Sequence, residues 1–362
     1  MLSFLREGFG NPSSVHAAGR EARAGVEEAR ERMATAIGAA PSEIVFTGGG
    51  TEADNLAIKG ALRKLRGNGN HLVTTAFEHH AVLDTCSWMV HQGFEQTVVR
   101  IPPSGVIDPQ AIVEATRPDT LLVSVMAVNN EIGTIQPVAE IVRAVRQAAP
   151  NAVVHTDAVQ ALPNIEVDVR GWGVDLAAFA AHKIGGPKGV GALYVRSGVA
   201  VEPLLHGGGQ ERGLRSGTLN VAGVAGMGLA AEFASKEIEA RRDRLGGLRD
   251  ALLAGVRSHV PDVIVNGEME RRVASNLNIS IPGTHGETLI LLLDRAGIAC
   301  SSGSACQSGA LDPSHVLAAL GVDESVAGGS LRFSLGRDST EADIDAVLEA
   351  LPAVVDAARR AA

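Results

Sequence analysis

The feature that most constrains the fold is an alternation of short apolar runs with longer helical stretches. The runs are rich in Val, Ile and Leu, and several are apolar on both faces, as parallel strands covered by helices on both sides are. This alternation predicts an α/β fold with a doubly wound, mostly parallel sheet. The expected strands are 43–48, 71–77, 97–101, 121–128, 152–158, 176–182 and 191–196.

Three of the intervening stretches predict helices most clearly. The stretch 16–38 is rich in Ala, Glu and Arg and closes at Gly38, a typical residue just beyond a helix. The stretches 51–65 and 138–149 have a similar pattern. The last two strands lie too close in sequence for a crossover helix, so we expect them to pair antiparallel at the edge of the sheet.

The pattern changes after about residue 235. It predicts a large domain over 1–235 and a smaller α+β domain over 236–362. The expected elements of the small domain are a long charged helix over 235–260, a strand at 276–281, a helix at 286–296, a polar Gly/Ser loop, a helix opened by Asp312 and Pro313, a strand at 329–335 and a final helix from about 340.

Composition limits the function classes. A net charge of −9 over 362 residues disfavours direct binding to DNA. No apolar run approaches the roughly 18 residues of a membrane span, and the first residues do not resemble a signal peptide. The three cysteines, Cys86, Cys300 and Cys306, do not make a disulfide framework. We therefore expect a cytoplasmic protein that does not interact with membranes.

A glycine-rich turn precedes the helix predicted over 51–65. Three glycines ending at Gly50 follow a strand, and Thr51 opens the helix. Backbone N–H groups at a helix N-terminus, together with a hydroxyl, form a cradle that suits a phosphate group. The alternative is a simple strand–turn–helix connection with Thr51 as its N-cap. The stretch is not a Walker A loop, because no Gly-Lys-Ser/Thr follows.

Two other polar residues are expected at the carboxyl ends of strands, where α/β sheets bind their ligands. Asp157 could pair with a cationic ring nitrogen or a metal ion, or simply act as a cap, and Gln160 follows three residues later. Lys183 could be a desolvated amine that captures an aldehyde, or a surface lysine. A phosphate cradle, a carboxylate and a lysine in this order are what pyridoxal 5′-phosphate (PLP) requires.

The small domain contributes a thiol and a guanidinium. Cys306 lies among Ser, Gly and Ala, which predicts a mobile, exposed loop that suits a travelling nucleophile. Cys300 follows an apolar stretch, so we interpret it as a half-buried structural thiol. Arg332 lies on a strand among apolar residues and is expected to bind a carboxylate of the protein or of a substrate. No ligand set predicts a resident metal ion.

These motifs together resemble the cysteine desulfurases of the class V aminotransferase group, in the iron–sulfur assembly branch with the long cysteine loop. The resemblance covers nearly the whole chain in the right order. It rests on NPSSVHAAGREAR, TGGGTEADNLAIKG, FEHHAVLD, VNNEIGTIQP, HTDAVQ, HKIGGPKGVGALYVR, HGGGQERGLRSGT, SSGSACQSG and LRFSLGR.

The resemblance implies a PLP enzyme of fold type I, a homodimer whose active sites lie at the subunit interface. It would convert L-cysteine to L-alanine and carry the sulfur as a cysteine persulfide. The sulfur would supply an iron–sulfur scaffold protein, tRNA thiolation acceptors, or both. A nascent iron–sulfur cluster is a possible contact of Cys306.

The resemblance also implies a role for individual residues. Lys183 would hold the cofactor covalently within a sequestered site, His79 would stack on its ring, and Cys306 would attack the substrate sulfur. Asn130 and Arg332 would bind the substrate, Arg332 through its carboxylate. The implied cofactor contacts are Gly50, Thr51, Asn130, Asp157, Gln160, His182, Lys183 and, from the other subunit, Thr218.

The chain departs from the family pattern in two places. Two residues before His182 the family has Ser or Thr, and this chain has Ala180. One lost hydrogen bond is worth about 0.5–1.5 kcal/mol, so weaker retention of PLP is expected, not its loss. The family also opens with a strand of the small domain, and this chain begins downstream of it. Either Met1 is a misassigned start or the small domain lacks a strand, which could impair stability or turnover.

Two alternatives remain open from the sequence. One is a selenocysteine lyase or desulfinase of the same fold. The other is a poorly active or non-catalytic scaffold protein, which the absent opening strand suggests.

Overall fold

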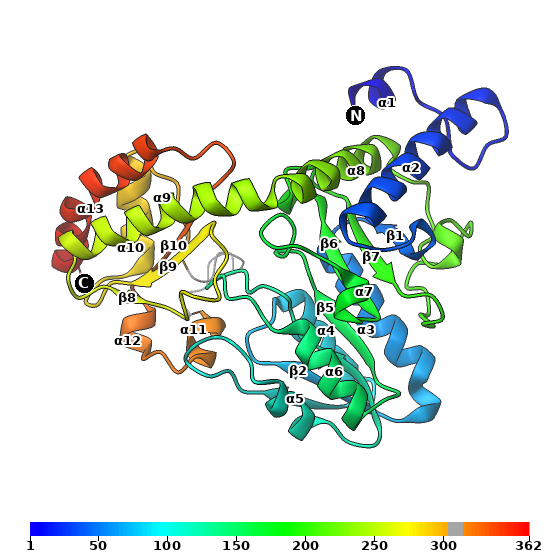
Figure 1. The fold of residues 1–362 in the computed structure, drawn as a ribbon, viewed down its shortest axis with the longest axis horizontal. Coiled ribbons are helices and arrows are strands. Elements are labelled where there is room, and N and C mark those ends of the chain that lie inside the picture. Colours follow the sequence, from blue (N-terminus) through cyan, green and yellow to red (C-terminus); the bar gives the residue numbers. More distant parts are fainter. Residues whose placement is uncertain (303–313, 362) are drawn as a thin grey trace. The chain divides into compact units, whose positions relative to one another are not determined.

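The computed structural model describes residues 1–302 and 314–361, and they form two compact units (Figure 1). The first unit comprises Met1–Val99, Asp108–Val128 and Pro137–Ile238, and the second comprises Arg100–Ile107, Asn129–Gln136 and Glu239–Ala362.

Two short segments from the first half of the sequence belong to the second unit because hydrogen bonds hold them there. The Gln136 side chain donates to the Gly105 carbonyl at 2.8 Å. The side chains of Asn276 and Asn278 both donate to the Glu131 carbonyl at 3.0 Å. A single domain boundary after residue 235 does not assign these two segments to the second unit, because they pair with residues far away in the sequence.

A seven-stranded sheet forms the centre of the first unit, in the order β1-β7-β6-β5-β4-β2-β3. The neighbours from β6 through β5, β4 and β2 to β3 run parallel, whereas β7 is antiparallel to both β6 and β1. The mixed, mostly parallel α/β fold is confirmed. The strands are β1 Ile44–Thr47, β2 His71–Thr75, β3 Glu95–Val99, β4 Thr120–Ser124, β5 Val153–Asp157, β6 Leu176–Ala180 and β7 Gly191–Val195.

The antiparallel pairing of β6 and β7 is confirmed, but its expected place at the edge of the sheet is wrong. β1 pairs with the outer side of β7, from Ile44 opposite Tyr194 to Thr47 opposite Gly191. β7 is wholly buried as a result. β1 is short, and the sequence pattern does not reveal that it joins this side of the sheet.

Helix α3 (Gly50–Leu65) crosses the sheet of the first unit and contacts β4, β5, β6 and β7 (Figure 1). It packs against α4 (His80–His91), while α2 (Ala17–Ala36) packs against α8 (Val221–Lys236). The other helical segments of the unit are α1 Leu2–Arg6, α5 Pro109–Ala115, α6 Val138–Ala148, α7 Val169–Trp172 and the 3₁₀ turns η1 Pro41–Glu43, η2 Arg66–Asn68, η3 Ala181–Lys183 and η4 Glu211–Gly213.

The second unit is built on a three-stranded antiparallel sheet in the order β10-β9-β8. Its core is aliphatic and gathers residues from this sheet and the surrounding helices. Its elements are α9 Ile238–His259, β8 Ile264–Val265, β9 Asn276–Ser280, α10 Gly286–Arg295, α11 His315–Ala319, α12 Glu324–Ala327, β10 Ser330–Ser334 and α13 Glu341–Ala361.

Two expected helix boundaries in the C-terminal part differ from the structure. The charged stretch 235–260 is mostly α9, which is separated from α8 at Glu237. The helix expected to open at Asp312 and Pro313 begins later, at His315. Ser314 is its N-cap and accepts from the Val316 N–H at 3.1 Å, whereas Asp312 and Pro313 lie outside the described residues.

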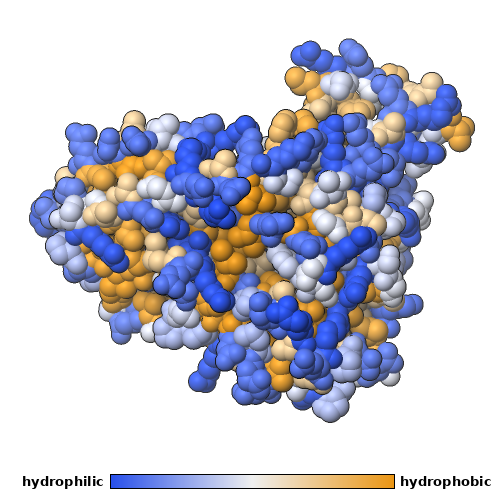
Figure 2. Space-filling view, in the orientation of Figure 1, coloured by the Kyte–Doolittle hydropathy of each residue, from blue (hydrophilic) through white to orange (hydrophobic). Residues whose placement is uncertain are grey.

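Exposed apolar side chains gather on the N-terminal segment, where Figure 2 shows orange atoms. Leu2, Leu5, Phe9 and Val15 are 65%, 66%, 88% and 84% exposed, respectively. Where exposed apolar side chains form one patch, they are typical of a surface that binds another protein. Among the described residues, no helix combines the length and the apolar character that a bilayer span needs.

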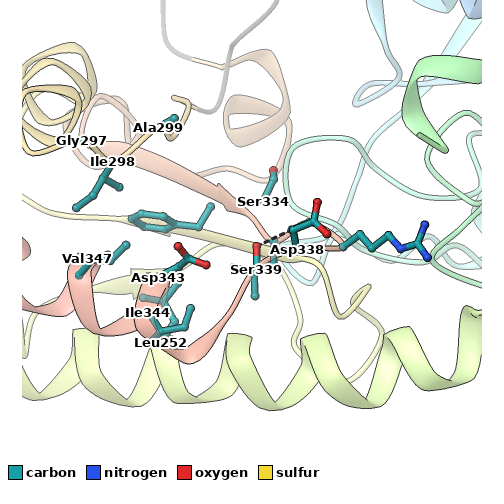
Figure 3. A pocket seen from close by; sticks show the side chains of 15 residues that line it. Leu252, Gly297, Ile298, Ala299, Ser334, Asp338, Ser339, Asp343, Ile344 and Val347 are labelled. Carbon is teal, nitrogen blue, oxygen red and sulfur yellow. Dashed lines mark hydrogen bonds between the residues drawn. The ribbon is translucent and has the colours of Figure 1, made fainter. Parts of the chain in front are cut away.

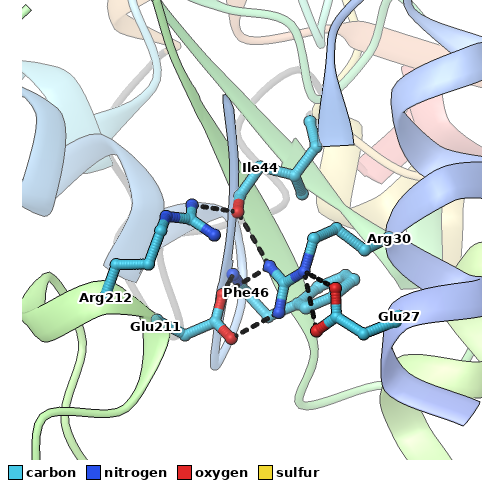
Figure 4. Close-up of polar contacts among 6 residues, drawn as sticks. All are labelled: Glu27, Arg30, Ile44, Phe46, Glu211 and Arg212. Atoms are coloured by element: carbon cyan, nitrogen blue, oxygen red, sulfur yellow. Dashed lines mark hydrogen bonds and ion pairs between the residues drawn. The ribbon is translucent and has the colours of Figure 1, made fainter. Parts of the chain in front are cut away.

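A buried ion pair joins α2 to the loop around η4 (Figure 4). The Arg30 guanidinium donates to both carboxylate oxygens of Glu211, at 2.8 and 2.7 Å, and to the Ile44 carbonyl at 2.8 Å. Glu211 also accepts from the Phe46 N–H at 2.7 Å. Glu211 and Arg212 have φ values of 48° and 57°, so this network holds two non-glycine residues in the left-handed region.

We predict that Arg30→Leu lowers the free energy of unfolding by about 3–5 kcal/mol, because it leaves the Glu211 carboxylate buried without its cation. Urea unfolding followed by circular dichroism measures this change. The matched control is Arg32→Leu on the same helix, which removes surface ion pairs with Glu28 and with Glu232 of α8 and should cost less than about 1 kcal/mol. Equal losses in the two variants would contradict the prediction.

Candidate active site

The predicted phosphate cradle is formed where β1 turns into α3. A β-carbon at Gly50 would lie 2.8 Å from Val159 Cγ2 and 3.4 Å from Ala180 Cβ. Only glycine lets the start of α3 come this close to the ends of β5 and β6. The first N–H groups of the helix have no intrahelical acceptor, so they are available to an anion. Ala180 lies beside this turn without a hydroxyl to add.

A cavity of about 760 Å³ opens over the cradle. It is lined by Gly48, Gly49, Gly50, Thr51, Glu52, Asn55, His182, Lys188 and Gly189. The predicted phosphate-binding residues Gly50, Thr51 and His182 therefore share one cavity. Glu52 fixes its rim, since it accepts from the Gly48 N–H at 2.8 Å and from Arg215 Nε at 2.8 Å.

His182 also lies beside positive charge. Its pKa is lowered, by burial first and then by the charges of Lys183 and Lys188. Lys188 is a cation of this cavity that the sequence analysis does not assign. The motif GPKG places it six residues after His182, and nothing in that spacing indicates that the chain folds back to the cradle.

The predicted carboxylate, lysine and stacking histidine lie within electrostatic reach of one another. Asp157 ends β5 and is buried, and its Oδ1 accepts from the Val159 N–H at 2.9 Å. Burial raises the pKa of Asp157 to about 6, while the Val159 hydrogen bond and the Lys183 charge oppose the rise. The pKa of His79 is lowered by burial first, then by the charges of His80 and Lys183.

His79 is the N-cap of α4 and is half-buried. Its Nδ1 accepts from the Ala81 N–H at 3.0 Å. A ring nitrogen that accepts carries no proton, so the neutral ring has its proton on Nε2. The cap fixes the orientation of the imidazole, which suits a ring that stacks on a planar ligand.

Lys183 is exposed, so the expectation that its side chain is sequestered is wrong for this chain. β6 ends at Ala180, and the chain turns through η3, which carries His182 and Lys183 beyond the end of the strand. The apolar run therefore buries Ala181 and not the lysine that follows. The side chain is nevertheless close enough to act on Asp157 and His79.

Two further predicted residues lie in loops of the first unit. Gln160 is half-buried just after β5, and its main-chain carbonyl accepts from Asn164 Nδ2 at 2.9 Å. Thr218 is exposed in the loop between η4 and α8. An exposed position is compatible with the role expected of Thr218 toward another subunit.

In the second unit, Arg332 and Asn130 meet. Arg332 is half-buried on β10, and its Nη1 donates to the Asn130 carbonyl at 2.9 Å. Arg332 Nε and Asn130 Oδ1 are buried without a hydrogen-bond partner among the described residues. A buried polar atom without a partner costs about 1–3 kcal/mol, so these atoms suit a ligand that supplies the missing bonds.

The residues that flank segment 303–313 attach beside this pair. Ser301 and Arg332 exchange two main-chain hydrogen bonds, at 3.1 and 2.6 Å. The Ser314 hydroxyl donates to Glu131, the residue after Asn130. Cys306 lies outside the described residues. Its two described flanks nevertheless both lie next to the predicted substrate-binding residues.

Cys300 is half-buried and packs against the core of the second unit, as expected. Burial first, and then the charge of Asp294, raise the pKa of its thiol to about 11. A thiol with this pKa is a poor nucleophile at neutral pH.

A separate cavity of about 410 Å³ lies in the second unit (Figure 3). Leu252, Ile298 and Val347 supply apolar walls, and a polar turn closes one side, where the Gly336 N–H donates to Ser339 Oγ at 2.9 Å. None of the predicted site residues lines this cavity. The geometry therefore favours the cradle cavity as part of the active site.

Comparison with known proteins decides the family. The class V aminotransferase family matches residues 1–347. The chain is 46% identical over 359 residues to the cysteine desulfurase IscS of Methanosarcina thermophila, an alignment that covers 99% of this chain and 88% of that protein. The chain belongs to the cysteine desulfurase family. Its fold is similar to a NifS-like protein, with a TM-score of 0.92 and 38% identity over 98% of this chain and 94% of that one.

The chain is also similar to a second solved structure, that of SspA in complex with cysteine. The TM-score is 0.81 and the identity 35%, and the match covers 92% of each chain.

Three buried acids beside the predicted site residues do not stand out in the sequence of this family member. Glu78 precedes His79 and accepts from Thr75 Oγ1 at 2.6 Å and from the Met126 N–H at 3.0 Å. Glu131 follows Asn130, and Asp54 lies one turn into α3. In the sequence each resembles an ordinary surface acid, because no spacing rule indicates that it points into the protein.

We predict that the stability of the wild type falls, relative to Glu131→Gln, as the pH rises from about 4.5 to about 7. Burial raises the pKa of Glu131 to about 7, although the Ser314 hydrogen bond and the Arg332 charge oppose it. The folded state therefore holds a proton that the unfolded state releases in this window, and the relative loss is about 3 kcal/mol.

Urea unfolding at several pH values measures this difference. The matched control is Glu349→Gln, at an exposed position in the same unit, which should give a constant difference from the wild type. A constant difference for Glu131→Gln as well would show that Glu131 is already ionised in the folded protein.

Proposed function

We propose that this chain is a PLP-dependent cysteine desulfurase that converts L-cysteine to L-alanine and takes up the sulfur as a persulfide on Cys306. The observation that carries the proposal is a conjunction in the first unit. The anion cradle at the start of α3 lies against Val159, two residues after the buried Asp157, and Lys183 is close enough to act on the Asp157 carboxyl group. The similarity to cysteine desulfurases over 99% of the chain supports it.

The residues present fit pyridoxal phosphate. The cavity of about 760 Å³ over the cradle offers helix N–H groups, a hydroxyl and an imidazole to a phosphate. Asp157 would hold the ring nitrogen, Lys183 the aldehyde carbon and Gln160 the ring hydroxyl, with His79 on the face of the ring. Thr218 of a second copy would add a hydroxyl to the phosphate. Pyridoxal phosphate, when bound, supplies an electron sink for the carbon skeleton of an amino acid.

The protonation states of the first unit suit this task. Above its pKa of about 6, Asp157 is an anion and can keep a proton on a neighbouring ring nitrogen. Because its pKa is lowered and its Nδ1 accepts from Ala81, His79 is a neutral ring at pH 7 with its proton on Nε2. It can therefore stack without adding charge.

The second unit would bind the substrate and receive its sulfur. Arg332 Nε and Asn130 Oδ1 are buried polar atoms that a substrate carboxylate and ammonium group would satisfy. The thiolate of Cys306 would attack the substrate sulfur and form the sulfur–sulfur bond of a persulfide. The electron pair of the broken carbon–sulfur bond would stay on the β-carbon, which takes up a proton, so that alanine leaves. The persulfide would then pass to an iron–sulfur scaffold protein or a tRNA-thiolation acceptor.

The exposed apolar side chains of Leu2, Leu5, Phe9 and Val15 support a homodimer, since a second copy would remove them from water. We also place the protein in the cytoplasm, where Cys86 and Cys300 would remain free thiols, as they are in this chain.

Lys183→Ala is expected to abolish the visible absorption band of the purified protein, because no other lysine is proposed to hold the cofactor. An absorption spectrum after incubation with excess PLP measures this. Lys64→Ala, an exposed lysine on α3, is the matched control and should keep the band. A wild-type chain that stays colourless under the same conditions would refute the proposed function.

Cys306→Ser should keep the visible band but reduce the release of sulfide and alanine from L-cysteine to background. Cys300→Ser is its matched control and should stay within about twofold of the wild type, because a half-buried thiol with a raised pKa does not supply the nucleophile. Selenide from selenocysteine and sulfite from cysteine sulfinate are measured in parallel. Full activity in Cys306→Ser would assign the nucleophile elsewhere.

A further inference from the structure

A network of buried polar side chains, Asp54, His155 and Ser124, lies near Asp157 and is not used in the proposed reaction. His155 and Asp157 are two residues apart on β5, so they point to the same face of the sheet. His155 Nδ1 is 2.8 Å from the Ser124 hydroxyl on β4. His155 Nε2 is 3.4 Å from Asp54 Oδ1 on α3. His155, Asp54 and Ser124 are all buried.

The contact between Asp54 and His155 needs one proton. Neither Asp54 Oδ1 nor His155 Nε2 has another hydrogen-bond partner among the described residues. With a proton shared between them, a small adjustment from 3.4 Å makes a hydrogen bond and removes the cost of two unsatisfied buried atoms. The proton can reside on the carboxyl group, with both groups neutral, or on the imidazole, as a buried ion pair.

The surrounding charges favour the neutral arrangement. Besides Asp157 and His155, the titratable groups that face Asp54 are Glu78, which follows β2, and the Cys86 thiol on α4. Three buried carboxyl groups share this cluster. Lys183 is the one cation among the described residues that acts on Asp157. Three buried anions against one cation would repel one another strongly, so protons must be retained on some of them.

The pKa values agree with this distribution. Burial, and then the charges of Asp157 and Glu78, raise the pKa of Asp54 well above its ordinary value. Burial raises the pKa of Glu78 to about 8 and lowers that of His155 to about 3. The pKa of Asp157 is about 6, which is lower than that of Glu78.

We propose that Asp54 is a protonated acid that donates to His155 Nε2 and that His155 donates from Nδ1 to Ser124. Because this network keeps Asp54 neutral, Asp157 is the single anion of the cluster. Asp54, His155 and Ser124 are positioning residues, since none is proposed to touch the cofactor. The proposal deepens the proposed function and rests on it for the role of Asp157, whereas the protonation of Asp54 and His155 is a property of the chain itself.

The direct test is the protonation of His155 in the full chain, with and without added PLP. Histidine-selective ¹⁵N labelling gives the ring signals, and the signals of His155 are those absent from His155→Gln. At pH 7 we expect a neutral ring with its proton on Nδ1. A ring protonated on both nitrogens, or on Nε2 alone, would overturn the proposal.

Substitutions of Asp54 test whether the protein needs this side chain as a neutral hydrogen-bond donor or as an anion. Asp54→Asn keeps an N–H donor without charge, whereas Asp54→Leu keeps the branch at Cγ, is larger, and removes the donor. We expect Asp54→Asn to unfold at a urea midpoint no lower than that of the wild type. Its advantage should grow as the pH rises above about 4, because burial of an acid whose folded pKa is raised weakens the wild type in this range.

Asp175→Asn is the matched control, since it makes the same change at another buried aspartate. The Asp175 carboxylate is paired with Arg146 and accepts from the Val154 N–H at 2.8 Å, so this variant should be less stable than the wild type. If Asp54→Asn is destabilised as strongly as Asp175→Asn, Asp54 is ionised and the proposal fails.

The binding and the visible absorption of PLP test the positioning role. We expect the dissociation constant for PLP and the pH at which the visible absorption changes to be the same in Asp54→Asn and the wild type. In Asp54→Leu the dissociation constant should rise, by at most about tenfold, because the loss of the Asp54 donor frees His155 and disturbs the end of β5 that carries Asp157. Equal behaviour of both variants would refute the positioning role. A wild-type chain that binds no PLP would refute the proposed function instead, and the His155 signals would still test the network.

Discussion

The close approach of α3 to the sheet determines where the polar groups of the first unit lie. A β-carbon at Gly191 would be 2.5 Å from the Gly49 carbonyl carbon, and one at Gly50 would be 2.8 Å from Val159. Glycine at these positions lets the helix begin directly over the ends of β5 and β6. The same approach has two results. The free N–H groups of the first turn face a cavity, and Asp54, one turn later, faces His155 on the sheet.

The two units present different chemistry. The first unit collects buried acids around one lysine, so its chemistry depends on which carboxyl groups keep their protons. The second unit holds a guanidinium and an amide with unsatisfied buried atoms, and it anchors both described flanks of the segment that contains Cys306. In the proposed reaction the first unit would therefore hold the cofactor, and the second would bind the substrate and carry the thiol.

Much of the fold and of the candidate site can be predicted from local patterns. The apolar runs locate the strands, and glycines with Thr51 locate the cradle, because these signals are confined to a few neighbouring residues. The predictions that fail concern features that contacts between residues far apart in the sequence determine. β1 joins β7 and moves β7 away from the edge, the Asn129–Gln136 segment pairs with the second unit, and η3 turns Lys183 outward. The sequence does not single out Asp54, Glu78 and His155, because tertiary packing buries them and burial determines their protonation states.

The contact between Arg30 and Glu211 has a consequence for the order in which the first unit takes shape. The two residues are 181 positions apart, and they are joined through the backbone of β1. A contact of such long range carries a loop-closure entropy that the short-range contacts of the sheet do not, so we expect it to form after them. We therefore also expect the left-handed conformation of Glu211 and Arg212, and with it the path of the chain toward Thr218, to be acquired late in folding.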